Sequence, residues 1–173
     1  MVGIRACCYA RLRRVVNLSF ERASIASFCS RQLGTPSALG DAPFAGLQFA
    51  CLLWNHGTGR DVDAATALLS SLIDGGCRYF VCGGLDGEWW HDLVDELIVS
   101  RYGDCTGDGR ERNHVMTTWH TGESPDDVAF FFVFNTSFDE IRFGCFLVLH
   151  LGDGSDVDGV DRAVEARARA LAS

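Results

Sequence analysis

The sequence predicts a small α/β domain in which helices cover both faces of a parallel sheet. Short runs that are apolar at every position alternate with stretches whose apolar residues repeat at helical spacing. Such uninterrupted apolar runs are typical of strands buried on both faces. Polar turns containing glycine separate the two kinds of segment. Strands and helices that alternate in this way favour a parallel sheet.

The clearest unit lies between residues 77 and 101. Residues 79–82 are an apolar run rich in strand formers, and two glycines, Gly83 and Gly84, break it. Asp86 is a candidate N-cap, because its carboxylate could accept hydrogen bonds from the free amides of the first helical turn. The helix that follows has one apolar stripe, made of Trp89, Trp90, Leu93, Val94, Leu97 and Ile98.

The same plan recurs on either side of this unit. Three further strands are expected at residues 47–54, 114–119 and 143–150. Helices are expected at residues 61–73, from residue 128 to about 134, and after the acidic turn at 153–156. Residues 15–28 could form one more helix, although its apolar face is weak.

The aromatic segment at residues 130–134 fits either a helix or a strand. A strong helix start precedes it, because Ser124 can cap, Pro125 suits the first position, and Asp126 and Asp127 meet the positive end of the helix dipole. These signals favour a helix.

The elements therefore follow the order β-α-β-α-β-α-β-α from about residue 46. Right-handed crossovers leave few topologies for such a chain. We expect a doubly wound, flavodoxin-like sheet of four parallel strands in the order 2-1-3-4.

The 173 residues divide by charge. Residues 1–40 hold six arginines and one acid, whereas residues 41–173 hold nine arginines and 22 acids, and the chain has no lysine. We expect a basic extension at residues 1–43 and a single α/β domain at residues 44–173. The extension could be a mis-called start, which we favour, a targeting segment, or a flexible arm that meets an acidic surface.

The acidic body limits the partners to be expected. It would repel a phosphate backbone, so nucleic-acid binding is disfavoured, whereas a basic protein partner would suit it. No apolar run approaches the roughly 20 residues of a membrane span. The eight cysteines show no C-x-x-C spacing, and several fall in apolar runs, which indicates buried free thiols and a reducing cytoplasm.

A candidate catalytic site lies where the predicted strands end. Ligands of doubly wound sheets bind at the carboxyl ends of the strands. His56, His120 and His150 would serve there as bases, Asp86 as a carboxylate, and Cys82 as a nucleophile if the helix start lowers its pKa. The competing explanation is that polar residues simply begin where strands leave the core.

Neither a metal nor a cofactor is predicted. The histidines and cysteines lack paired ligand spacing, and the glycine turn at residues 83–87 lacks both the G-x-G-x-x-G pattern and the lysine of a phosphate-binding loop. Asp86 would also place a negative charge where a phosphate would bind.

Three segments resemble a family of small uncharacterised bacterial α/β proteins. They are CRYFVCGGLDGEWWHDLVDE, HVMTTWHTGESPDDVAFFF and FLVLHL, and the VMTTWH strand at residues 115–120 is the most specific. The resemblance implies an α/β fold from about residue 45 and no established activity.

Two functions of different class remain open. The first is a non-enzymatic binding or regulatory module, for example an immunity-type protein that masks a basic partner. The alternative is a small hydrolase or transferase whose site lies at the strand ends. The acidic body and the lack of a catalytic motif favour binding.

Overall fold

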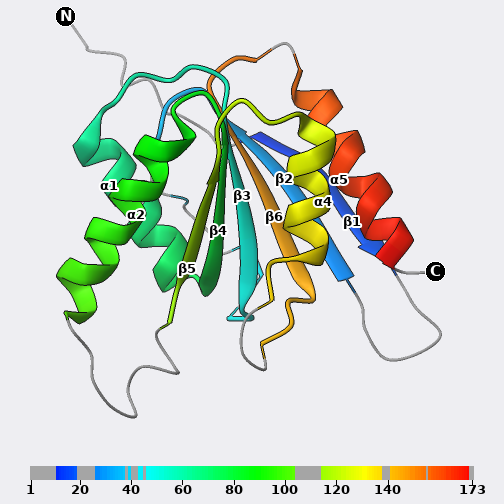
Figure 1. Ribbon diagram of the computed structural model, residues 1–173, viewed down its shortest axis with the longest axis horizontal. Helices are drawn as coiled ribbons and strands as arrows, with labels where there is room; N and C mark the ends of the chain where they lie inside the picture. Colours follow the sequence, from blue (N-terminus) through cyan, green and yellow to red (C-terminus); the bar gives the residue numbers. More distant parts are fainter. Residues whose placement is uncertain are drawn as a thin grey trace, which may run out of the picture.

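The computed structural model describes residues 11–18, 26–37, 39, 43–44, 46–103, 114–137, 141–154 and 156–171. Within these residues, one six-stranded sheet is flanked by helices (Figure 1). The strands are β1 (Arg11–Leu18), β2 (Ala26–Leu33), β3 (Phe49–Asn55), β4 (Cys77–Gly84), β5 (Met116–His120) and β6 (Cys145–Leu151). The helices are α1 (Val62–Asp74), α2 (Gly87–Tyr102), α4 (Pro125–Phe134) and α5 (Val157–Leu171).

The sheet has the order β1-β2-β6-β3-β4-β5. Five strands, from β2 to β5 in this order, are parallel, and β1 pairs antiparallel with β2. The predicted α/β class and parallel sheet are therefore confirmed. The predicted four strands in the order 2-1-3-4 are wrong, because the fourth predicted strand, β6, lies beside the first, β3, and two earlier strands continue the sheet.

Burial explains this order. Every residue of β6 is buried, as is every residue of β3, so both strands need neighbours on both sides. Only the last of the five residues of β5 is buried, so β5 suits the edge of the sheet. The order reverses between β3 and β6, which makes that junction the topological switch point.

The N-terminal part of the chain differs most from expectation. The helix predicted for residues 15–28 is wrong, because β1 and β2 lie there. In β2, Phe28 packs into the core on one face of the sheet and Cys29 into the core on the other, which is the two-residue period of a strand. The sheet thus extends across the expected boundary at residues 43–44. Residues 1–10 and 19–25 lie outside the described residues, so the idea of a mis-called start stays a prediction.

The sheet separates two hydrophobic cores. One lies under α1 and α2 and holds Leu68, Leu72 and Trp90, while the other lies under α4 and α5 and holds Phe132 and Val160. Figure 1 shows the two pairs of helices on opposite sides of the sheet. The aromatic segment is helical as predicted, and Ser124 Oγ accepts from Asp127 N at 3.2 Å.

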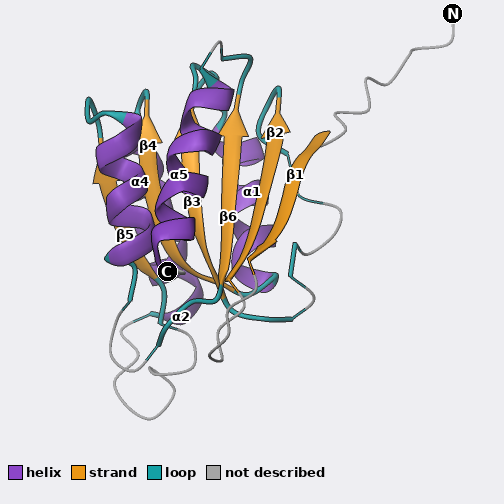
Figure 2. Cartoon of the chain, turned by 90° about the vertical axis from the view of Figure 1, so that its right-hand side faces the viewer, coloured by secondary structure: helices purple, strands orange, loops and turns teal. Residues whose placement is uncertain are grey.

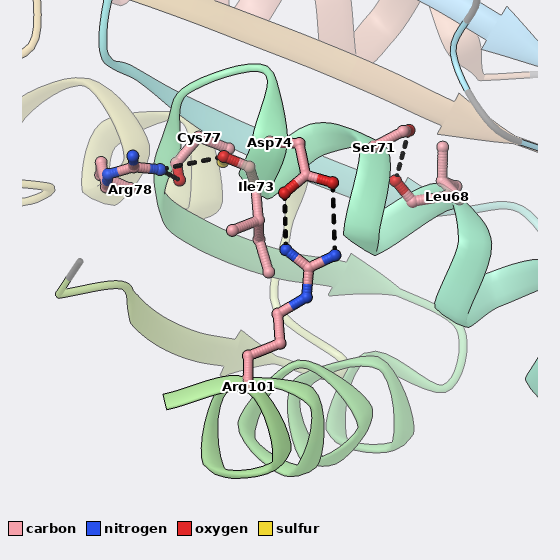
Figure 3. A network of polar contacts seen from close by, with 7 residues as sticks. All are labelled: Leu68, Ser71, Ile73, Asp74, Cys77, Arg78 and Arg101. Carbon is pink, nitrogen blue, oxygen red and sulfur yellow. Dashed lines mark hydrogen bonds and ion pairs between the residues drawn. The ribbon is translucent and has the colours of Figure 1, made fainter. Parts of the chain in front are cut away.

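One ion pair and two hydrogen bonds from an arginine join α1, α2 and β4 at the end of the sheet opposite the strand carboxyl ends. The Arg101 guanidinium, in the last turn of α2, donates to both carboxylate oxygens of Asp74 at 2.7 and 3.3 Å (Figure 3). Arg78 donates to the carbonyls of Ile73 and Cys77.

None of the helices in the described part of the chain has the length and apolar character needed to cross a lipid bilayer.

Candidate functional site

Three polar side chains form a hydrogen-bonded chain at the switch point between β3 and β6. His56 follows β3, His150 is the sixth residue of β6, and Asp161 lies in α5. His56 Nε2 lies 3.0 Å from His150 Nδ1, and His150 Nε2 lies 2.9 Å from Asp161 Oδ1. Both His150 and Asp161 are buried, whereas His56 is half-buried. This hydrogen-bonded chain of side chains therefore runs from the core under α5 to the carboxyl ends of the strands.

Local structure explains why these residues meet. Side chains of a strand alternate between faces, so His150 follows Phe146 and Val148 onto the α5 face. Asp161 lies on the buried side of α5, beside Val160 and Val164. The sequence marks it as an acid on an apolar helical stripe, and that signal could have identified it, but sequence reasoning missed Asp161 as a site residue.

The hydrogen-bond pattern fixes where protons can sit. A carboxylate only accepts, so His150 Nε2–H donates to Asp161. One hydrogen then lies between His150 and His56. It resides on His56 Nε2 or, when the other ring nitrogen of His56 also carries a hydrogen, on His150 Nδ1. When His56 is doubly protonated, moving that hydrogen to His150 shifts positive charge toward the buried carboxylate, which is the action of a proton relay.

The backbone around His56 is tightly fitted to its ring. The His56 amide donates to the Leu151 carbonyl at 2.8 Å, which ties the turn after β3 to the end of β6. The rings of His56 and His150 are stacked, with centroids 5.2 Å apart. A β-carbon at Gly154 would lie 2.0 Å from His56 Nδ1. Only glycine at position 154 therefore leaves room for this imidazole.

Asn55, the last residue of β3, organises the turn that carries His56. Its Oδ1 accepts from the amides of Gly57 and Thr58, at 3.0 and 2.9 Å, and from the Thr58 hydroxyl at 3.0 Å. The side chain is buried, so these bonds replace water as partners of the turn. Asn55 is a positioning residue that the sequence marked only as part of a turn.

His120 is separated from this chain. It ends β5, which is two strand spacings, or about 10 Å, from β3. Its Nδ1 lies 2.9 Å from Glu123 Oε2, and its ring packs on Phe131 at 4.5 Å. The expectation that three histidines gather at one site is therefore wrong, because β4 lies between β5 and β3 while β6 adjoins β3.

Asp86 has a different role from the one expected. It occupies the N-cap position of α2, but its φ of 55° is left-handed and its side chain caps no amide. Instead, its carboxylate accepts from the Arg60 guanidinium at 2.6 Å, and this hydrogen bond lowers the pKa of Asp86. The Arg60 guanidinium also lies 5.9 Å from the centre of the Trp89 ring.

Cys82 is not placed as a nucleophile. Its side chain is buried in the core under α1 and α2, on the face opposite His150. The sequence suggested that the start of α2 would lower its pKa. Burial instead raises the pKa of Cys82 far above the usual value for a thiol, with a smaller contribution from Cys77. A neutral, buried thiol cannot attack a substrate at the rim.

Of the five residues predicted for the site, the structure thus brings together His56 and His150 and adds Asp161. Within the described ranges, no three His, Cys, Asp or Glu side chains are grouped so that they could hold a metal ion.

These features define a doubly wound α/β protein with a polar chain at its switch point. The chain belongs to the family described as Domain of unknown function (DUF7684), whose model matches residues 28–167. The match begins inside β2, so it covers the five parallel strands of the sheet apart from the start of β2. Comparisons with curated proteins and with solved structures gave no match.

Proposed function

We propose that the protein is a small hydrolase or transferase that uses His56 as a general base. The observation that supports this proposal is the hydrogen-bonded chain of Asp161, His150 and His56 at the switch point. General bases in enzymes are most often histidines, and a buried carboxylate commonly orients them through a hydrogen bond.

The proposed proton path runs through the His56 imidazole to His150. His56 takes a proton from a water molecule or a substrate hydroxyl as that oxygen attacks the substrate. His56 Nε2–H then passes its proton to His150 Nδ1, so that the positive charge comes to rest beside Asp161. A proton then returns from His150 Nδ1 to His56 Nε2 while His56 gives a proton to the leaving group, which restores the starting state. His150 bonds His56, and Asp161 bonds His150, so both act as positioning residues that do not touch the substrate.

Screening for turnover would test this proposal. Wild-type protein is incubated with chromogenic esters, amides, phosphodiesters and glycosides, and any activity is compared in three variants. His56→Gln and Asp161→Asn should lower kcat by about 100-fold or more, the usual range for general-base catalysis. His120→Gln is the matched control, because His120 also bonds a carboxylate but lies outside the chain, and it should keep full activity. Unchanged turnover in His56→Gln would contradict the proposal.

The negative charge at the carboxyl ends of the strands supports a second candidate function, the binding of a basic partner. The helices start at this end of the sheet, and their first turns contain many acids. Ten acids lie in or just before these first turns: Asp61, Asp63, Asp86, Glu88, Glu123, Asp126, Asp127, Asp153, Asp156 and Asp158.

The helix dipoles offset only part of this charge. Each helix N-terminus is equivalent to about half a positive charge, so the four described helices contribute about two. Arg60 adds one more. Several negative charges remain uncompensated, which favours a basic protein as the partner of a regulatory module.

A further inference from the structure

The β5 strand forms an edge of the sheet. It pairs with β4 on one side, and among the described strands none pairs with its other side (Figure 2). The outward N–H and C=O groups of an edge strand are a template for one more strand. Proteins usually block such edges with lysine, proline or a bulge, but the residues MTTWH contain neither lysine nor proline, and their register with β4 is regular.

A large aromatic side chain stands beside this edge. Trp119 is 51% exposed, whereas Trp54 and Trp90 are buried. Its ring packs edge-on against His91 of α2, with centroids 4.6 Å apart. A half-exposed tryptophan held in place by a neighbouring ring is the kind of residue that dominates the energy of protein interfaces.

Acids flank the strand on both faces. On the α2 side, Asp95 accepts from the Thr117 hydroxyl at 2.8 Å, and Asp92 lies 3.2 Å from His91 Nδ1. On the α4 side, Glu123 bonds His120. All three carboxylates are exposed. The outer side of β5, which no described strand pairs with, therefore lies between two negatively charged borders.

We propose that the β5 edge accepts an extended, arginine- or lysine-rich segment of a partner protein as a seventh strand. The backbone of the segment pairs with β5, its basic side chains face Asp92, Asp95 and Glu123, and one side chain packs on Trp119. A second copy of this chain fits less well, because pairing two β5 edges would bring like carboxylates together. The inference rests on the second candidate function, the binding of a basic partner, and not on acid–base catalysis.

Synthetic peptides provide the probe. A fluorescently labelled eight-residue peptide of arginine and valine, with arginines at both odd and even positions so that they flank β5 on both faces, is titrated with the full chain, and the same peptide with glutamate in place of arginine is the control. We expect only the basic peptide to bind, with an affinity that falls as salt is added. Hydrogen exchange of the wild-type complex should show new protection at residues 116–120.

Two variants with the same charge change separate the edge from the rest of the surface. Trp119→Lys adds a blocking cation to the edge and should weaken peptide binding by about tenfold or more. Leu47→Lys places a lysine at a similarly exposed apolar residue before β3 and should bind as the wild type does. The wild-type exchange experiment remains decisive if Trp119→Lys fails to fold.

Each outcome has a definite meaning. Salt-sensitive binding with protection outside residues 116–120 would overturn the β5 edge as the site but keep the basic partner. No binding of the basic peptide would overturn both. Protection of residues 116–120 that appears without peptide as protein concentration rises would show that a second copy occupies the edge.

Discussion

The two faces of the sheet bury titratable side chains in different ways. Under α1 and α2, Cys51 and Cys82 are fully buried, and desolvation raises the pKa of both, so they stay neutral thiols. Under α5, His150 and Asp161 are equally buried but keep a 2.9 Å hydrogen bond to each other. The second face therefore buries an imidazole bonded to a carboxylate, so acid–base chemistry is to be sought there.

The largest expected effect breaks the buried pair. Asp161→Ala leaves His150 buried without its acceptor, and we expect the free energy of unfolding to fall by about 3–5 kcal/mol. Urea unfolding measures this change. Arg162→Ala, at an exposed charged residue of the same helix, should change stability by about 0.5 kcal/mol or less. Equal losses in the two variants would mean that the pair adds nothing beyond the helix itself.

The two buried thiols under α1 and α2, Cys51 and Cys82, should make the stability of the protein depend on alkaline pH. Folding raises the pKa of Cys51 and Cys82, so their contribution to stability is fully present below the pKa of an unfolded thiol, about 8.5, and is lost as pH rises above it. One pH unit above the pKa of an unfolded thiol, ionisation of each thiol in the unfolded state lowers the free energy of unfolding by about 1.4 kcal/mol.

Urea unfolding between pH 7 and 9.5, under reducing conditions, would measure this loss. The double variant Cys51→Ala, Cys82→Ala should be less stable at pH 7 but should lose less stability on going to pH 9.5. A pH dependence equal to that of the wild type would show that other groups cause it.

A smaller change can disturb the polar chain without touching it. Gly154→Ala places a methyl group against His56 Nδ1, and we expect a loss of about 1–3 kcal/mol together with displacement of the ring. Gly59→Ala is the control, because no atom lies within 4 Å of its added carbon. The ¹H–¹⁵N signals of the His56 and His150 rings should shift in Gly154→Ala alone. Unshifted signals would contradict the tight fit.

The imidazole–carboxylate pair whose carboxylate is exposed should matter least. His120 and Glu123 are separated by the same 2.9 Å as the buried pair, but the Glu123 side chain is 48% exposed. Glu123→Gln should therefore change the free energy of unfolding by about 1 kcal/mol or less. A loss as large as that of Asp161→Ala would show that distance, and not burial, sets the strength of such pairs.

The predicted elements were largely correct because their signals are local. The apolar runs at β3, β4 and β6, the helical stripe of α1 and the capping residue Ser124 all act within one turn or one strand. The N-terminal strands were missed because their alternating pattern is weak and polar residues interrupt it. Asp86 lies at the predicted N-cap position, but its carboxylate bonds Arg60, 26 residues away, which no local pattern indicates.

The sequence by itself determined that strands and helices alternate and that histidines follow the strands. Only the tertiary structure decided which histidines meet. His56 and His150 are 94 residues apart, and they touch because β6 lies between β2 and β3. Strand order depends on which buried edges must be covered, and that is a property of the whole sheet that no local period encodes.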